Sequence, residues 1–228
     1  MPALDPLDDI AEGIRAAWTE RNTVRDTTLV RSRELIRLCA TVIRASHRND
    51  LEKAQRLLRE AREVATVMCS EAIPYPDLYY AGYTQDALKE LAEAYITVAL
   101  AQDEPLPTPQ EIEIEAPAYL NGLAEAASEM RRRSLDLIRH GDNAEAERLL
   151  STMDDVYAVL MTFDFPDAIT GGLRRRVDAL RGVLERTRGD LTMSMRQDAL
   201  RQALREFEQR VGMSDEGRAG DDVTGAMG

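Results

Sequence analysis

Hydrophobic residues recur every three to four positions along most of this chain, and the polar residues between them follow the same period. That spacing is typical of amphipathic helices, whereas the period-two alternation that indicates strands is nearly absent. The sequence therefore predicts an all-α fold, a single-domain seven-helix bundle with long amphipathic helices. The expected segments, one of them a short acidic turn, cover residues 6–47, 51–70, 77–101, 111–115, 116–139, 143–161 and 172–211.

Helix-breaking residues separate these segments by short connections, as expected when consecutive helices pack side by side. Asn49-Asp50 predicts a break followed by an N-cap, and Ile73-Pro74-Tyr75-Pro76 predicts a rigid connector. Three prolines between 103 and 109 indicate a loop, and Gly141 is a suitable C-terminal cap. We expect the helical domain to span 1–212, with an acidic, disordered tail at 213–228.

The ends and the apolar content of the chain bear on its location. No apolar run reaches the roughly 18 residues that a membrane span needs. The first residues, MPALDPLDD, lack the basic and apolar regions of a signal peptide. The two cysteines, Cys39 and Cys69, are isolated and predict reduced thiols. We therefore expect a cytoplasmic protein without a membrane partner.

The net charge of −12 argues against a surface that attracts nucleic acid over long distances. The basic residues are unusual, however, because only Lys53 and Lys89 are lysines among the 29 basic residues. A chain rich in acids and poor in lysine suits a cytoplasm at high salt, where the Debye length falls to about 3 Å and only local contacts count. A halophilic source is thus a hypothesis from composition; a folding midpoint that fell with rising salt would contradict it.

Two pairs of glutamates are the candidate metal-binding and catalytic residues. Glu90 and Glu93 lie three residues apart in KELAEA, and Glu125 and Glu129 lie four apart in YLNGLAEAASEM, so each pair shares one face of its helix. Four carboxylates without an imidazole or thiolate favour Mg²⁺ or Mn²⁺. Phosphodiester hydrolysis is the natural reaction for such a cluster.

Helical periodicity by itself gives a different interpretation of the same glutamates. On a helical wheel all four lie opposite the apolar stripe of their helix, beside polar neighbours, as expected for solvated faces. A metal site requires instead that the two polar faces meet in a groove or inside a hollow assembly. His47 and His140 stand in no Glu-x-x-His motif, so the sequence does not indicate a di-iron bundle.

Arginines form two stripes. Arg33, Arg37, Arg44 and Arg48 share one face of the first helix, and either a contact with an RNA backbone or a solvated or intersubunit face explains them. The second stripe lies on the last helix and alternates with acids, which favours an intrahelical ladder over phosphate binding. Its members are Arg174, Asp178, Arg181, Glu185 and Arg188.

Three stretches together resemble one known family. FPDAITGGLRRRVDALRGVLERTRGDLT is similar to the C-terminal region of archaeal translin-family proteins. RNTVRDTTLVRSRELIRLCATVIRASHR resembles their first long helix, and YLNGLAEAASEMRRRSLDLIRHGD resembles their segment with a Tyr-Leu-x-Gly start and a Gly-Asp close. The resemblance covers most of residues 15 to 192.

The resemblance implies an all-α, seven-helix bundle that assembles into a hollow octamer. Translin-type subunits of this family bind single-stranded nucleic acid, and TRAX-type subunits add a Mg²⁺-dependent endoribonuclease site that faces the interior. The TRAX motifs match Glu90 and Glu93, then Glu125 and Glu129. Glu125 stands where TRAX-type subunits usually carry Asp, which keeps the carboxylate but adds a methylene.

The expected function is therefore a TRAX-like, homo-oligomeric endoribonuclease that cleaves single-stranded RNA, with Mg²⁺ (or Mn²⁺) held by the four glutamates. Single-stranded DNA is a second expected ligand. The alternative is a translin-type shell that binds RNA or DNA without cleaving it. The full set of four glutamates is typical of TRAX-type subunits and not of translin-type subunits, which disfavours that alternative. Residues 80–86 also lack the basic and histidine residues of translin's nucleic-acid region, which disfavours tight, sequence-independent binding of DNA.

Overall fold

The computed structural model describes residues 5–212 of the 228-residue chain, and these residues form helices and connections with no strand. The all-α fold class is confirmed. The predicted disordered tail, 213–228, lies outside the described residues. The helices are α1 (Asp5–His47), α2 (Leu51–Ala72), α3 (Pro76–Tyr79), α4 (Gly82–Gln102), α5 (Ala116–Arg139), α6 (Asn143–Leu160), α7 (Asp167–Thr170) and α8 (Leu173–Val211).

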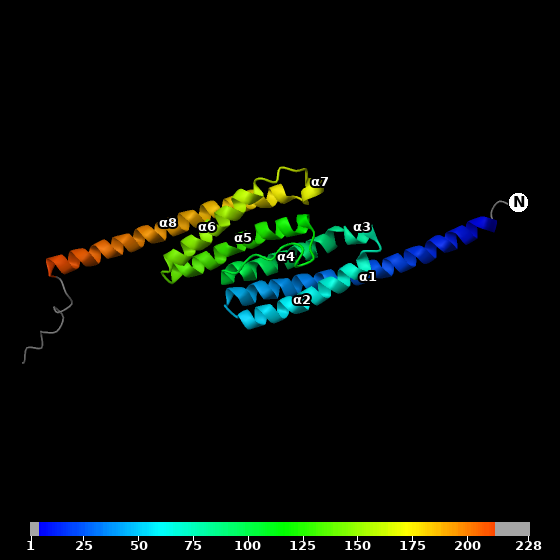
Figure 1. Cartoon of the computed structure of the whole chain (residues 1–228), viewed down its shortest axis with the longest axis horizontal. Helices are drawn as coiled ribbons and strands as arrows, with labels where there is room; N and C mark the ends of the chain where they lie inside the picture. The colour runs from blue at the N-terminus through cyan, green and yellow to red at the C-terminus, as the bar shows by residue number, and fades with distance from the viewer. Residues whose placement is uncertain (1–4, 213–228) are drawn as a thin grey trace, which may run out of the picture.

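The helices pack in three pairs around one continuous core. Figure 1 shows α4 and α5 in the middle, with α1 and α2 on one side and α6 and α8 on the other. The Asp50 side chain caps α2 by accepting from Lys53 N at 3.3 Å, and Asp142 caps α6 in the same way through Glu145 N at 3.2 Å. The central pair carries the candidate site, because α4 holds one pair of glutamates and α5 the other.

The structure divides the helical segments differently from the sequence prediction. The expected helix at 77–101 is interrupted before Gly82, which leaves the single turn α3 ahead of α4. The expected acidic helical turn at 111–115 is not a helix, because Glu113 takes a left-handed φ of 57° and the chain turns to bury Ile112 and Ile114. The short α7 lies between the expected helices at 143–161 and 172–211, where the sequence predicts no helix. Two left-handed glycines, Gly171 and Gly172, separate it from α8.

Helix α4 is the most enclosed of the long helices. It packs against α1, α2 and α5, and its buried positions lie all around the helix axis rather than on one stripe. Thr97 is fully buried and Glu93 is only 9% exposed. The wheel-based interpretation, which placed the α4 glutamates on a solvated face, is therefore wrong for Glu93.

The two longest helices project beyond the bundle at opposite ends (Figure 1). The first half of α1 and the second half of α8 leave large apolar side chains exposed. These are Leu7, Ile10, Ile14 and Trp18 on α1, and Met193, Leu200, Leu204, Phe207 and Val211 on α8. No helix within residues 5–212 combines the length and the apolar character that crossing a membrane requires.

Candidate carboxylate site between two central helices

The structure brings three of the four predicted glutamates together across the α4–α5 contact. Glu90 and Glu93 of α4 and Glu125 of α5 each offer one carboxylate oxygen, and these oxygens lie within 4.8 Å of one another. The helices approach closely there because Gly122 has no side chain. The convergence that a carboxylate site requires is therefore present within a single chain.

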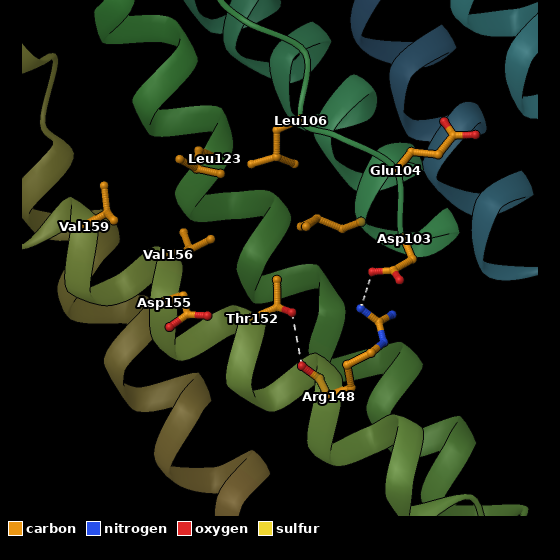
Figure 2. Close-up of a pocket in the computed structure, with 10 residues that line it drawn as sticks. Asp103, Glu104, Leu106, Leu123, Arg148, Thr152, Asp155, Val156 and Val159 are labelled. Atoms are coloured by element: carbon orange, nitrogen blue, oxygen red, sulfur yellow. Dashed lines mark hydrogen bonds and ion pairs between the residues drawn. The ribbon is translucent and has the colours of Figure 1, made fainter.

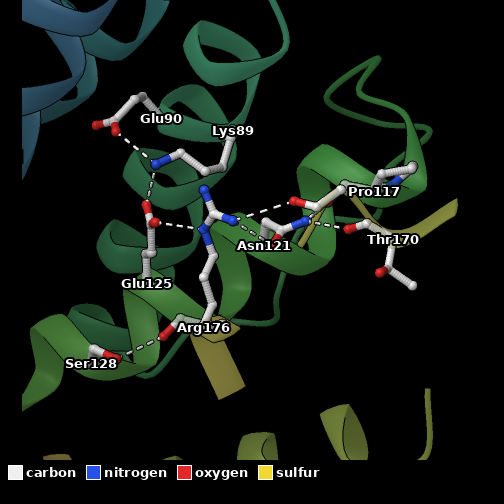
Figure 3. A network of polar contacts seen from close by, with 10 residues as sticks. Lys89, Glu90, Pro117, Asn121, Glu125, Ser128, Thr170 and Arg176 are labelled. Carbon is white, nitrogen blue, oxygen red and sulfur yellow. Dashed lines mark hydrogen bonds and ion pairs between the residues drawn. The ribbon is translucent and has the colours of Figure 1, made fainter. Parts of the chain in front are cut away.

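Lys89 bridges the two helices inside this carboxylate cluster. Its ammonium donates to Glu90 Oε1 at 2.9 Å and also to Glu125 Oε2 across the helix interface. Figure 3 shows the lysine side chain lying between these two carboxylates. Burial opposes the charged ammonium, but the hydrogen bonds that Lys89 donates to Glu125 and Glu90 outweigh this effect and raise the pKa of Lys89.

Arg176 of α8 holds the other oxygen of Glu125. Its Nε donates to Glu125 Oε1 at 2.7 Å, and its Nη1 donates to Asn121 Oδ1 at 3.1 Å (Figure 3). Asn121 is itself fixed by donating to the backbone carbonyls of Pro117 and Thr170, both at 2.7 Å. Burial would raise the pKa of Glu125, but the hydrogen bonds from Lys89 and Arg176 lower it below its usual value. Glu125 is thus a fixed anion.

Glu93 has a different environment from its neighbours. It is nine-tenths buried, and within residues 5–212 its carboxylate accepts no hydrogen bond and forms no ion pair. Burial, together with the negative charges of Glu90 and Glu125, raises the pKa of Glu93 to about 8. The carboxyl group therefore carries a proton at neutral pH unless a cation joins the cluster.

Glu129 lies one turn beyond Glu125 and outside the three-oxygen group. Its Oε1 is 2.6 Å from Nε2 of His47, a nearly buried side chain at the end of α1. The hydrogen bond from His47 lowers the pKa of Glu129 against the opposing effect of burial. Glu129 also lines a hollow of about 360 Å³ on α5, together with Arg131 and Arg132.

The cluster suits a hard divalent cation on two grounds. Its donors are carboxylate oxygens from three residues, which is the ligand type that Mg²⁺ and Mn²⁺ prefer. In addition, a buried carboxylate without a partner is unfavourable, and a bound cation would compensate it. Glu90, Glu93 and Glu125 would hold such an ion, with Glu129 near enough to contribute through its charge.

The four arginines of the first stripe lie exposed on α1. Arg33, Arg37, Arg44 and Arg48 form no ion pair with any described residue, and Arg44 donates only to Thr41 Oγ1 of its own helix, at 2.9 Å. Their positive charge is therefore available to an outside partner.

The second stripe forms only part of the ladder that the sequence indicated. Arg188 pairs with Glu185 at 3.1 Å, but it also reaches Asp154 of α6 at 2.7 Å. This arginine joins α8 to α6 and is not free to bind phosphate.

A separate cavity of about 380 Å³ opens between the end of α4, α5 and α6. Figure 2 shows Leu106, Leu123, Val156 and Val159 around it, with Arg148 pairing with Asp103 at 2.7 Å at one side. None of the four glutamates lines this cavity, so the carboxylate cluster is a distinct feature of the molecule.

Comparison with known proteins places the chain in a family. It is 32% identical over 198 residues to an uncharacterised protein of Methanocaldococcus jannaschii, a match that covers 86% of each chain. The crystal structure of AfC3PO superposes with a TM-score of 0.75 at 31% identity, covering 81% of this chain and 96% of that one. This chain belongs to the translin family.

Two further solved structures are similar to this chain. The structure of AfC3PO in complex with duplex RNA superposes on this chain with a TM-score of 0.73 at 31% identity. The match covers 81% of this chain and 96% of the AfC3PO chain. Apo-NeC3PO, at 20% identity and a TM-score of 0.70, shares the fold over 85% of this chain and 98% of that one. No family model matches the sequence.

Sequence reasoning missed three residues of the site. Lys89 precedes Glu90 in KELAEA, but nothing in that motif shows that its side chain reaches α5. Arg176 comes from the RRR run at the start of α8, and His47 was considered only for a di-iron motif. One feature of the sequence could have indicated a special role for Lys89: it is one of only two lysines in a chain whose other Lys and Arg positions are all arginine.

Proposed function

We propose that this translin-family chain is an RNA-binding subunit whose three-carboxylate cluster is the metal site of an endoribonuclease. The observation that carries the proposal is the convergence of carboxylate oxygens from Glu90, Glu93 and Glu125, in which the buried Glu93 has no hydrogen-bond or ion-pair partner among the described residues. When bound, Mg²⁺ or Mn²⁺ supplies activation of a water molecule and stabilisation of the charge that develops on a phosphoryl group.

The residues of the chain have separate roles in metal binding, in positioning the glutamates and in contacting RNA. Glu93 and Glu90 present α4 carboxylates, and Glu125 presents one from α5, held in place by Arg176. His47 holds Glu129 through a 2.6 Å hydrogen bond beside the cluster. The exposed arginines of α1 provide charge-assisted hydrogen bonds to phosphates of an RNA strand.

Two findings support RNA as the substrate class. A similar protein at 31% identity, AfC3PO, forms a complex with duplex RNA. The chain also keeps Arg33, Arg37, Arg44 and Arg48 free of acidic partners among the described residues, despite its net charge of −12. Single-stranded RNA is the expected substrate, and both strand states belong in the test.

Self-association into a hollow octamer is part of the proposal. The apolar side chains on the projecting ends of α1 and α8 are too numerous for solvated surfaces, and a second copy of the chain would cover them. An enclosed assembly would turn the polar side of the α4–α5 pair toward its interior.

The test is cleavage of end-labelled single-stranded and duplex RNA by EDTA-treated protein, with and without Mg²⁺ or Mn²⁺. Wild type is compared with Glu93→Gln and with Glu185→Gln, whose carboxylate lies exposed on α8. We expect metal-dependent cleavage in wild type and Glu185→Gln, and a loss of at least about a hundredfold in Glu93→Gln. Equal cleavage by Glu93→Gln, or cleavage in EDTA, would reject the assignment.

A non-catalytic RNA-binding shell is the second candidate, and one observation favours it. Lys89 and Arg176 already neutralise much of the negative charge of the cluster. This candidate predicts retention of RNA by wild type without turnover at any concentration of metal.

A further inference from the structure

Lys89 is the least expected residue in the carboxylate cluster. The chain uses arginine at 27 of its 29 basic positions, yet a lysine lies in the cluster, nine-tenths buried, between two of its three carboxylates. A guanidinium is planar and holds carboxylates bidentately, whereas an ammonium is a compact charge on a flexible stem. The lysine therefore provides a cation of small size that can move.

We propose that Lys89 is a built-in counter-cation of this site: its ammonium holds Glu90 and Glu125 together until a divalent cation displaces it, and it thereby lowers the affinity of the site for metal. This inference rests on the proposed metal site and adds to it the residue that sets metal affinity.

The hydrogen bonds of Glu125 show which of its partners can leave. Glu125 Oε1 is bound by Arg176, and Glu125 Oε2 is bound by Lys89. Arg176 is fixed by two further acceptors, Asn121 Oδ1 at 3.1 Å and the Gly171 carbonyl at 3.4 Å. The Lys89 ammonium has only the two carboxylates as acceptors among the described residues. A metal ion entering the cluster would therefore replace Lys89 rather than Arg176.

Charge balance supports the same conclusion. Without a cation, Glu90, Glu125 and Glu129 would be negative groups close to the buried Glu93, which the interior of a bundle does not tolerate. Lys89 and Arg176 supply two positive charges that keep the α4–α5 contact intact without metal. A divalent ion and an ammonium in the same cluster would repel each other, so metal binding and the present position of Lys89 exclude one another.

Mn²⁺ binding by EDTA-treated full-length protein tests the inference, with free Mn²⁺ followed by its EPR signal. Lys89→Met removes the ammonium and keeps the length of the side chain. Lys53→Met is the matched control, because Lys53 is the other lysine and lies exposed on α2. We expect Lys89→Met to bind Mn²⁺ about tenfold more tightly than wild type, since a competing charge has gone. Lys53→Met should bind like wild type, and adding Glu93→Gln to Lys89→Met should remove the gain.

The outcomes separate this inference from the proposed function. If wild type binds Mn²⁺ but Lys89→Met binds equally or more weakly, the counter-cation role is overturned and the metal site stands. If neither protein binds Mn²⁺, both are overturned.

A second measurement uses wild type alone and does not depend on how the variant folds. Lysine acetylation by an N-hydroxysuccinimide ester is followed by mass spectrometry with and without Mn²⁺. Displacement by the metal predicts faster acetylation of Lys89 by several-fold, while Lys53 in the same molecule serves as the reference. An unchanged ratio of the two rates under conditions in which Mn²⁺ binds would show that the ammonium stays in place and would overturn the inference.

Discussion

Gly122 of α5 lies directly against the backbone of Glu93 of α4. A β-carbon at position 122 would come within 2.9 Å of the Glu93 amide nitrogen, and within 2.8 Å of the Lys89 carbonyl oxygen. Contacts below about 3 Å do not occur for real β-carbons, so only glycine permits this separation of the two helices. The closeness of α4 and α5 is what brings carboxylate oxygens from both helices within 4.8 Å of one another.

Gly122→Ala is therefore expected to push α4 and α5 apart. Since the added methyl group would meet backbone atoms rather than flexible side-chain ends, we expect a loss of about 1–3 kcal/mol in the free energy of unfolding. The wider separation should also reduce Mn²⁺ binding at the cluster. Urea denaturation and Mn²⁺ titration measure the two effects.

Gly189→Ala is the matched control for this substitution. Gly189 lies inside α8, and a β-carbon there would meet nothing within 4 Å. Alanine is the better helix former, so the control should gain about 0.5–1 kcal/mol. A Gly122→Ala protein as stable as this control would contradict the close packing described here.

Part of the site could be predicted from the sequence. The spacing of Glu90 with Glu93 and of Glu125 with Glu129 placed each pair on one helix face, and the family resemblance matched these positions to the TRAX motifs. The burial of Glu93 could not be predicted, because a helical wheel treats a helix as having one buried face. Helix α4 is covered from several sides by α1, α2 and α5, so a polar position can be enclosed.

The partners of the glutamates also depend on the tertiary structure. Lys89 reaches Glu125, 36 positions further along the chain, and His47 reaches Glu129 across 82 positions. A local sequence pattern does not show which residues so far apart along the chain come into contact. The expected helix at 111–115 does not form either: the chain turns at Glu113, with a left-handed φ of 57°, and buries Ile112 and Ile114 in the core, a tertiary contact that the local sequence does not show.

The raised pKa of Glu93 makes stability depend on pH in metal-free protein. Its folded value is about 8 and its ordinary value is 4.5, so the folded state keeps a proton that the unfolded state releases. The contribution of this group is full below pH 4.5 and is lost as pH rises to about 8. Glu93→Gln mimics the protonated carboxyl at every pH. Its stability relative to wild type should therefore improve by at least about 1 kcal/mol between pH 5.5 and 8.5.

Urea denaturation in EDTA at these two pH values measures this change. Glu34→Gln, at an exposed position on α1, is the control, and its difference from wild type should stay constant. A Glu93→Gln protein whose difference from wild type is equally constant would show that the buried carboxyl is ionised in the folded state.

The α1 arginine stripe should govern RNA affinity without affecting the fold. Replacing both Arg37 and Arg44 by Gln removes two exposed charges, which is expected to weaken RNA binding and to lower the slope of log K against log salt by roughly 1–2. Arg186→Gln, at an exposed position on α8 ahead of its projecting end, is the control for loss of charge alone. Filter binding at several salt concentrations gives both quantities, and an unchanged slope in the double variant would remove the stripe from the RNA interface.

His47 and His140, the two histidines of the chain, permit a paired test of how Glu129 is held. The nearly buried His47 bonds to Glu129 at 2.6 Å, whereas the exposed His140 contacts only the Asp136 carbonyl of its own helix, at 2.7 Å. His47→Ala should lower the free energy of unfolding at pH 7 by about 1.5–3 kcal/mol, the usual range for a hydrogen bond to a charged group. His140→Ala should cost less than about 0.5 kcal/mol.

Because the bond between His47 and Glu129 lowers the pKa of Glu129 below its ordinary 4.5, this stabilisation is present above pH 4.5 and is lost as pH falls through the folded value. The cost of His47→Ala should accordingly shrink in acid, and urea denaturation in steps from pH 7 down to pH 3 measures it. A cost that stays constant over this whole range would mean that His47 contributes by packing and not by holding the Glu129 carboxylate.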